Sequence, residues 1–404
     1  MTNRKSGPGL GRGLHRDELA MSGPDSVEVA ESVARRVAAY VHIPFCRRTC
    51  PYCDFAVVAG TALADRYVAA VCAEIGRADP FSEPLAAVAF GGGTPTTLGW
   101  RALERLLLAI ESRFGVEADV EISLEANPED IQPTTARDLA AAGFRRISLG
   151  VQSFDDGVLA ALGRAHTAED ARDAVSAARE EFESVNVDLI LGTPGETIAS
   201  WESSVRVVLD AGIAHLSTYS LTVERGTPLS RAVAAGAPAP DPDQAAEAWL
   251  LAAEMAAEAG MVRYETSNYA RPGHAVVYNL VTWGQGEYAA FGNAAHRHRD
   301  GVRSWNVRRL DRYLERMERG EPVVSGEERL GAWERDVERV MLGLRRAAGV
   351  RVGIVGERLL LSYGGATLRR AGILEVVGDR LRIARPLLGD EVSRALLALA
   401  PTDC

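Results

Sequence analysis

The sequence is poor in cysteine, has no long apolar run and has no excess of positive charge, and each of these absences excludes a class of protein. Five cysteines among 404 residues are too few for a disulfide scaffold. A formal net charge of −10 gives no electrostatic reason to bind nucleic acid or an anionic membrane. No apolar run approaches the roughly 20 residues that span a bilayer, and the N-terminus lacks the apolar core of a secretory signal. We therefore expect a cytoplasmic protein with no membrane span and no nucleic-acid partner.

Residues 1–36 lack an apolar period and are rich in glycine, proline, arginine, serine and glutamate, so we expect a disordered tail. From residue 38 onward, short apolar runs alternate with segments of helical period, which is the pattern of βα units around a parallel sheet. Six such units are too few for a closed eight-stranded barrel, so we predict an α/β fold with a partial (β/α)6 barrel over residues 37–225. The predicted strands are Ala38–Ile43, Leu85–Phe90, Val120–Leu124, Arg146–Val151, Val185–Leu191 and His215–Leu221. The predicted helices are Asp65–Arg77, Arg101–Phe114, Thr134–Ala142, Ala168–Glu181 and Ser200–Ala211.

The pattern changes after Arg225. Residues 226–306 begin with a long helical pattern, Asp241 to Gly260, and continue with an aromatic stretch, Tyr264 to Trp305, that is predicted to be irregular and to cover the barrel. Residues 307–404 alternate helical patterns with strands rich in leucine and valine, so we predict a mostly helical C-terminal domain with a small β-hairpin. The elements predicted there are the helices Arg308–Arg319 and Trp333–Arg346 and the hairpin Ile373–Ile383.

Three thiols follow the first predicted strand in a C-x3-C-x2-C loop, at Cys46, Cys50 and Cys53. Three thiolates can hold three irons of a cubane and leave the fourth iron open, whereas four cysteines close the site. The alternative is a zinc site made of the three cysteines and His42. Because a structural zinc loop has no need to lie at the C-terminal end of a barrel strand, we favour a [4Fe-4S] cluster.

A run of three glycines, Gly91 to Gly93, follows the second predicted strand and precedes Thr94 and Pro95. Three successive glycines remove every Cβ, so backbone N–H and C=O groups can approach a polar ligand closely. The loop lacks the lysine of a P-loop, and the guest expected here is the carboxylate or ammonium group of an amino acid. An ordinary turn is the alternative.

Polar side chains recur at the ends of the later strands, where barrel sites are built. Glu125 ends the third predicted strand and Gln152 the fourth. Asp188 lies inside an apolar strand, where a charged group must be paired or must face a cavity because burying it alone is costly. Arg164 follows the fourth strand and could pair with a ligand carboxylate. The alternatives are polar groups that cap helices and a solvated arginine.

In combination, the C-x3-C-x2-C loop, the glycine triplet with Thr-Pro and the segments Ser148–Ser153, Gly163–Thr167 and Val187–Gly195 resemble the radical S-adenosylmethionine (SAM) family of oxygen-independent coproporphyrinogen III oxidases. The oxidases carry a further cysteine two residues after the third ligand, where this chain has Phe55. The absence of that cysteine resembles the haem-chaperone branch of the family, HemW, whose members are understood to bind haem and deliver it to acceptor proteins.

The resemblance implies a [4Fe-4S] cluster on Cys46, Cys50 and Cys53 whose open iron takes the amino and carboxylate groups of SAM. In the oxidase-type mechanism, one electron from a donor such as flavodoxin or ferredoxin cleaves the SAM sulfonium to methionine and a 5′-deoxyadenosyl radical. No catalytic residue is assigned. The positions that match SAM contacts of the family are Tyr40, Gly92, Gly93, Thr94, Glu125, Gln152, Arg164 and Asp188.

HemW proteins have an H-N-x-x-Y-W motif linked to haem binding, and the matching stretch here has Tyr278 and Thr282 in place of the histidine and the tyrosine. Tyr278 could still ligate haem iron through its oxygen. His296 is a further candidate ligand, with a structural histidine as the alternative. The residues expected near haem are Tyr278, Asn279, Trp283 and His296.

Three functions stay open at this point. The first is a haem chaperone with a cluster, SAM and an unknown acceptor protein. The second is an oxidative decarboxylase of the coproporphyrinogen III oxidase type, against which the missing fourth cysteine counts. The third is a paralogue that keeps the fold and the cluster but binds neither haem nor porphyrin, which the altered Tyr278 and Thr282 favour.

Overall fold

A computed structural model of the chain describes residues 31–33 and 35–400. Most of the predicted tail, residues 1–30 and 34, lies outside the described residues. In the described part of the chain, no helix combines the length and the apolar character that crossing a bilayer requires.

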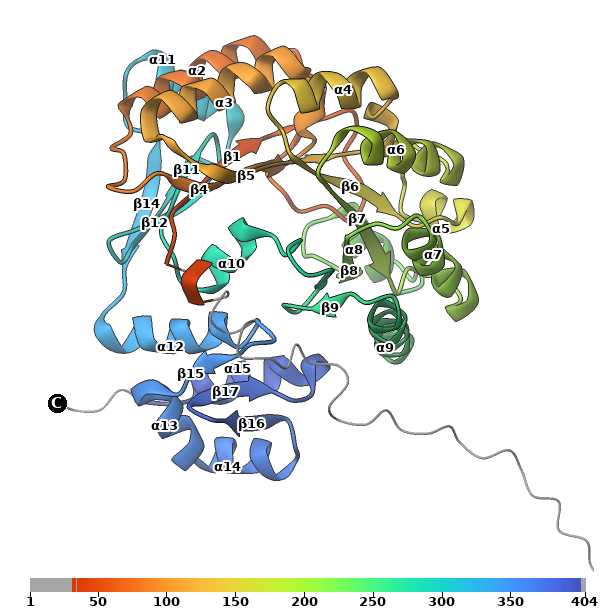
Figure 1. Cartoon of the computed structure of the whole chain (residues 1–404), viewed down its shortest axis with the longest axis vertical. Helices are drawn as coiled ribbons and strands as arrows, with labels where there is room; N and C mark the ends of the chain where they lie inside the picture. Colours follow the sequence, from red (N-terminus) through yellow and green to blue (C-terminus); the bar gives the residue numbers. More distant parts are fainter. Residues whose placement is uncertain (1–30, 34, 401–404) are drawn as a thin grey trace, which may run out of the picture.

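Six parallel strands form the centre of the fold and neighbour one another in chain order. The strands are β1 (Ala38–Ile43), β4 (Leu85–Gly92), β5 (Val116–Ala126), β6 (Arg146–Gln152), β7 (Ser184–Leu191) and β8 (His215–Ser220). The helices on the outer face of this sheet (Figure 1) are α2 (Ala64–Arg77), α3 (Trp100–Phe114), α4 (Pro133–Ala141), α5 (Asp156–Ala161), α6 (Ala168–Glu181) and α7 (Ile198–Asp210). This arrangement confirms the predicted partial (β/α)6 barrel.

Alternation along each strand decides which side chains face the helices and which face the barrel interior. In β1, Ala39, Val41 and Ile43 are fully buried in the hydrophobic core beneath the helices. Tyr40 and His42 alternate with them and therefore point to the interior. The same rule turns the polar residues of the later strands inward, so this part of the barrel interior is polar while the outer face of the sheet is apolar.

The sheet continues beyond the barrel on both sides, in the order β14-β13-β12-β11-β1 at one edge and β8-β10-β9 at the other. The added strands are β9 (Val262–Arg263), β10 (Asn268–Ala270), β11 (Tyr288–Phe291), β12 (His296–Arg299), β13 (Val302–Asn306) and β14 (Val324–Arg329). The prediction of an irregular stretch from Tyr264 to Trp305 is therefore wrong. These strands escape prediction because they are short and carry no alternating apolar pattern, and β12 contains no apolar residue at all.

Two helices of this middle region lie on opposite faces of the sheet. The long predicted helix is α9 (Pro242–Glu258), which packs on the outside of the barrel. The next element in the chain is β9, the strand at the edge of the sheet. By contrast, α10 (Val277–Trp283) lies on the inner face, opposite to α2 and α3 (Figure 1). Its Val281 is fully buried against Ala38 of β1 and Ala87 of β4, so α10 fills the interior near the start of these strands.

A second hydrophobic core lies in the C-terminal part of the chain and includes Val340, Val355, Leu359 and Leu381. Its antiparallel strands have the order β15-β17-β16, so the predicted hairpin is present and a third strand joins it. Upstream of it, α8 (Pro228–Ala234) precedes α9, and α11 (Leu310–Glu318) packs against α2 in the barrel core. The elements of this second unit are α12 (Ala332–Gly343), β15 (Val350–Arg351), α13 (Gly353–Leu361), α14 (Tyr363–Arg370), β16 (Leu374–Val377), β17 (Arg380–Ile383) and α15 (Gly389–Leu397).

Candidate functional site

The three predicted thiols lie in one loop at the carboxyl end of β1. The loop starts with the short strand β2 (Phe45–Cys46) and returns through β3 (Val58–Ala59), which pairs with it. Cys46, Cys50 and Cys53 are each half-buried, and none forms a disulfide. Among the residues that the structure describes, no three His, Cys, Asp or Glu side chains converge on a point where they could share one metal ion.

Two of the three thiols, those of Cys46 and Cys53, are protonated at neutral pH in the metal-free chain. Burial raises the pKa of Cys46 to about 11, against the effect of a hydrogen bond from Thr94, and burial also raises the pKa of Cys53. Iron is bound by thiolates, so binding of iron here releases protons.

Each glycine of the triplet allows a different site residue to come close. A Cβ on Gly91 would lie 2.7 Å from Oε1 of Glu125, and one on Gly92 would overlap the ring of His42. A Cβ on Gly93 would lie 3.0 Å from Sγ of Cys46. Gly92 has a φ of 109°, which side chains other than glycine rarely adopt, and its N–H donates to Oε2 of Glu125 at 3.0 Å. The three glycines therefore leave the space that Glu125, His42 and Cys46 occupy.

His42 is not available as an extra ligand in this arrangement. Its ring is buried beside Gly92, and its Nε2 lies 3.1 Å from the carbonyl oxygen of Ala56. Burial lowers the pKa of His42, so the imidazole is neutral at pH 7.

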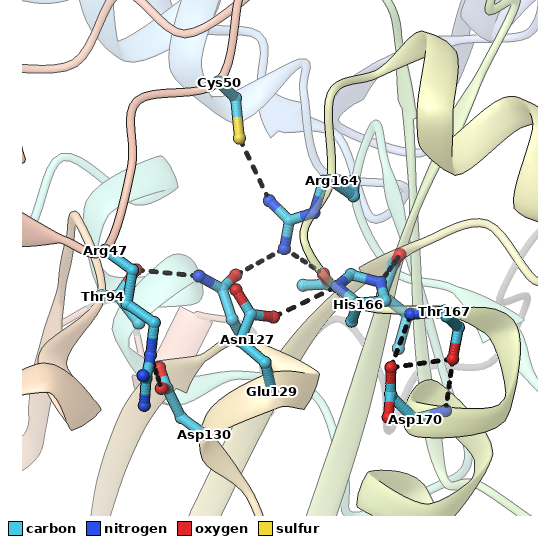
Figure 2. Close-up of polar contacts among 12 residues, drawn as sticks. Arg47, Cys50, Thr94, Asn127, Glu129, Asp130, Arg164, His166, Thr167 and Asp170 are labelled. Carbon is cyan, nitrogen blue, oxygen red and sulfur yellow. Dashed lines mark hydrogen bonds and ion pairs between the residues drawn. The ribbon is translucent and has the colours of Figure 1, made fainter.

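A chain of hydrogen bonds connects two of the thiols. Thr94 donates to Sγ of Cys46 at 3.7 Å and accepts from Asn127 at 2.9 Å. Arg164 donates to Oδ1 of Asn127 at 2.6 Å and to Sγ of Cys50 at 3.5 Å. Figure 2 shows Arg164 between Cys50 and Asn127. The structure thus brings the predicted Thr94 and Arg164 to the thiol loop through Asn127.

Asn127 and His166 escape prediction from the sequence. Asn127 lies just beyond β5, two residues after the predicted Glu125, and only its long-range contacts reveal its position. The buried His166 contacts Oε2 of Glu129 at 3.2 Å and the carbonyl oxygen of Val151 at 2.9 Å, so it holds the loop after β6 (Figure 2). His166 lies in the segment Gly163–Thr167 together with Arg164, and this position is the signal that could have identified it.

Two carboxylates face the interior of the barrel. Burial raises the pKa of Glu125 to about 7, and the negative charge of Asp188 adds to this effect. Burial also raises the pKa of Asp188, although its carboxylate accepts hydrogen bonds of 2.8 Å from Ser148 and from Asn186. The predicted Asp188 is therefore both hydrogen-bonded and directed to the interior.

Gln152 ends β6 with a φ of 70°, which is unusual for a residue other than glycine. This backbone conformation costs roughly 1–2 kcal/mol, and such costs are common at functional sites. The predicted Tyr40 lies on the inner face of β1, where its ring stacks on Tyr278 of α10 with centroids 5.8 Å apart.

The residues expected near haem lie in two separate environments. Tyr278 is held between Tyr40 and Tyr288, and burial raises its pKa. Asn279 and Trp283 lie on the same helix, and the guanidinium of Arg345 lies 5.1 Å from the centre of the Trp283 ring. His296 is instead exposed at the start of β12.

Thr282 replaces the tyrosine of the haem motif, and its hydroxyl group forms a hydrogen bond within α10. Thr282 donates to the carbonyl oxygen of Asn279 at 2.9 Å. The ring of His296 stacks on Trp305 with centroids 5.8 Å apart, and its pKa is lowered by partial burial and by the positive charge of Arg303.

Comparison with known proteins fits these features. Residues 40–208 match the Radical SAM superfamily. The heme chaperone HemW of Synechocystis sp. is 39% identical over 326 residues, which cover 78% of this chain and 79% of the relative. The heme chaperone HemW of Mycobacterium tuberculosis is 38% identical over 374 residues, which cover 89% of this chain and 94% of the relative. The chain belongs to the HemW family.

Membership of the HemW family, within the radical SAM superfamily, implies a [4Fe-4S] cluster and SAM as cofactors. Among solved structures, the coproporphyrinogen III oxidase HemN from Escherichia coli resembles this chain with a TM-score of 0.77 and covers 94% of each chain. Because the two sequences are only 22% identical, this likeness shows the fold of this chain and not its activity.

Proposed function

We propose that Cys46, Cys50 and Cys53 hold the [4Fe-4S] cluster of this protein, and that the protein binds haem and delivers it to an acceptor. The observation that carries the first part is the set of three free thiols in one loop at the mouth of the barrel. The donor set fits a cubane, because each thiolate binds a different iron and the three need not converge on one point, as zinc ligands must.

The residues around the thiols support binding of SAM at the open iron. Such a cluster supplies one electron to SAM, and we expect an external donor such as flavodoxin or ferredoxin to reduce it. Glu125 and Asp188 offer acceptors to the ammonium and hydroxyl groups of SAM, while Arg164 holds the thiol loop. The residues proposed to contact SAM are Tyr40, Gly92, Gly93, Thr94, Glu125, Gln152, Arg164 and Asp188.

The proposal of haem binding rests on the relatives, which are named heme chaperones at 38–39% identity. Among the candidate ligands, Tyr278 packs on Tyr40 and would have to lose its proton against a raised pKa. His296 is exposed, and its lowered pKa keeps the imidazole neutral, which is the form that binds iron. We therefore propose His296 as the haem ligand and Tyr278, Asn279 and Trp283 as part of the inner wall of the barrel.

Haem titration of the anaerobically reconstituted protein, followed by the Soret band, tests this proposal. We expect one haem per wild-type chain, weaker binding in His296→Ala, and unchanged binding in Tyr278→Phe, which keeps the stacked ring. Absence of saturable haem binding in a wild-type sample that contains its cluster would overturn the chaperone function. Loss of binding in Tyr278→Phe with retention in His296→Ala would reverse the assignment of the ligand.

A further inference from the structure

A row of polar side chains crosses the inner face of the barrel next to Asp188. The strand register places Ser148 of β6, Asn186 of β7 and His215 of β8 side by side, and Asp188 lies two residues further along β7. Leu216, which follows His215, is fully buried in the core on the other face of the sheet. Asn186 and His215 are buried as well, although neither is proposed above to contact SAM.

Asn186 joins this row to the carboxylate of Asp188. Its amide nitrogen donates to Oδ1 of Asp188 at 2.8 Å and to Oγ of Ser148 at 2.6 Å. Ser148 in turn donates to Oδ2 of Asp188 at 2.8 Å, so both carboxylate oxygens receive a hydrogen bond. Because the amide nitrogen of Asn186 faces the carboxylate, its amide oxygen is directed to His215.

His215 connects Asn186 to Tyr264, the first residue after β9. Nδ1 of His215 lies 2.6 Å from Oδ1 of Asn186, and Nε2 lies 2.9 Å from the hydroxyl oxygen of Tyr264. Burial lowers the pKa of His215, so the imidazole is neutral at pH 7 and carries a proton on one nitrogen only. An amide oxygen can only accept, so the proton is on Nδ1, and Nε2 accepts from the hydroxyl of Tyr264.

Tyr264 is fixed in place by its own backbone and by its ring. Its N–H donates to the carbonyl oxygen of Asn268 at 3.2 Å, and its carbonyl oxygen accepts from the N–H of Ala347 at 2.9 Å. The buried ring meets that of His215 edge-on with centroids 5.6 Å apart. The hydroxyl oxygen accepts from the N–H of Val276, just before α10, at 3.3 Å. The hydroxyl group therefore has a defined position from which it orients the imidazole.

We propose that Tyr264 and His215 are positioning residues for Asp188, and that they act on SAM binding through Asn186. The donors of this chain all point the same way, from the N–H of Val276 to the hydroxyl, the imidazole, the amide and the carboxylate. Hydrogen bonds that run in one direction polarise one another, so the chain strengthens the donor that faces Asp188. The carboxylate is thereby held as an acceptor for a hydroxyl group of SAM. This inference rests on the contact between Asp188 and SAM that is proposed above.

A double-mutant cycle of Tyr264→Phe and Asp188→Asn tests the proposal, with the SAM affinity of the anaerobically reconstituted full chain measured by equilibrium dialysis. Tyr264→Phe keeps the ring and removes only the hydroxyl group, so we expect SAM to bind about fivefold more weakly, as for the loss of one hydrogen bond. Asp188→Asn removes a charged acceptor and should bind SAM about tenfold more weakly. Because Tyr264 acts through Asp188, Tyr264→Phe should cause no further loss in the Asp188→Asn background.

The matched control is Tyr269→Phe on β10. Tyr269 is also buried, but it is paired in register with Leu216, and its ring contacts Trp249 of α9 on the outer side of the sheet. Its hydroxyl group is thus no part of the chain that leads to Asp188, and Tyr269→Phe should bind SAM like wild type.

The direction of the chain has a test of its own in the metal-free protein. Nitrogen NMR spectra of selectively labelled histidines should show the proton of His215 on Nδ1, with its signals identified by their absence from His215→Phe.

The two proposals fail in different ways. An unchanged affinity in Tyr264→Phe, equal losses from Tyr264→Phe in both backgrounds, an equal loss in Tyr269→Phe, or a proton on Nε2 of His215 would overturn the positioning role while the contact of Asp188 with SAM stands. Wild-type affinity in Asp188→Asn would instead refute that contact, and with it any role of Tyr264 and His215 in SAM binding.

Discussion

Gly91, Gly92 and Gly93 occupy positions where added atoms would meet Glu125, His42 or Cys46. The thiol loop, the carboxylate of Glu125 and the imidazole therefore depend on the same three residues for their close approach. Several other glycines also have a positive φ but have no neighbour within 4 Å of an added Cβ. Alanine substitutions at the two kinds of glycine can therefore separate the cost of backbone strain from the cost of steric overlap.

Gly92→Ala should destabilise the protein more than Gly60→Ala. Gly60 has a φ of 84° and an added Cβ meets nothing within 4 Å, so its substitution costs only the strain of the backbone, about 1 kcal/mol. At Gly92 the same strain is joined by overlap with the His42 ring, and we expect a total loss of about 2–4 kcal/mol. Urea unfolding of both variants measures the difference, and equal losses would contradict the packing role of Gly92.

Glu125 should make stability depend on pH. Its folded-state pKa, about 7, lies above that of an unfolded glutamate, so the folded chain holds a proton there that the unfolded chain has lost. The contribution of Glu125 to stability is therefore largest below the unfolded pKa and falls as the pH rises to about 7. The variant Glu125→Gln keeps the acceptor for the N–H of Gly92 and carries no charge. We expect its free energy of unfolding, relative to that of wild type, to be higher at pH 8 than at pH 5. If urea unfolding shows the same difference in free energy of unfolding between the two proteins at every pH in this range, the raised pKa is contradicted.

At the scale of the elements, α10 decides how the inner face of the barrel is closed. Val281 is fully buried against small residues of β1 and β4, and Tyr278 lies on Tyr40. The helix therefore takes the space beneath the proposed cofactor site that solvent would otherwise fill.

Val281→Ala should lower the free energy of unfolding by about 2 kcal/mol, because it removes two buried methyl groups and leaves a cavity. The control is Val377→Ala in β16, whose side chain is 47% exposed and should contribute within about 0.5 kcal/mol. Equal effects of the two substitutions would contradict the position of α10 inside the barrel.

The sequence predicts the elements whose pattern is strong and misses those whose pairing is remote. Apolar runs such as Ala38–Ile43 and Ser184–Leu191 mark the barrel strands, and the polar residues at their ends mark much of the candidate site. The strand His296–Arg299 contains only histidine and arginine, so nothing local distinguishes it from a loop. Asn127 and the stack of Tyr278 on Tyr40 depend on contacts between distant segments, which no local pattern contains.

At the scale of the whole molecule, two hydrophobic cores are joined by a polar seam. The N–H of Ala347 donates to the carbonyl oxygen of Tyr264 at 2.9 Å, and Arg303 of the barrel sheet forms an ion pair with Glu338 of α12. Arg380 of the C-terminal unit pairs with Glu31, near the start of the described chain.

The central claim is that Cys46, Cys50 and Cys53 hold a cubane with one open iron. The most direct test is the iron and sulfide content of the anaerobically reconstituted chain, together with its EPR spectrum after reduction, with and without SAM. We expect about four irons and four sulfides in wild type and in the half-buried Cys72→Ala control, with an EPR signal that SAM alters, and loss of the cluster from a still-folded Cys50→Ala. A full iron content in Cys50→Ala, or a wild-type signal that SAM leaves unchanged, would contradict the claim.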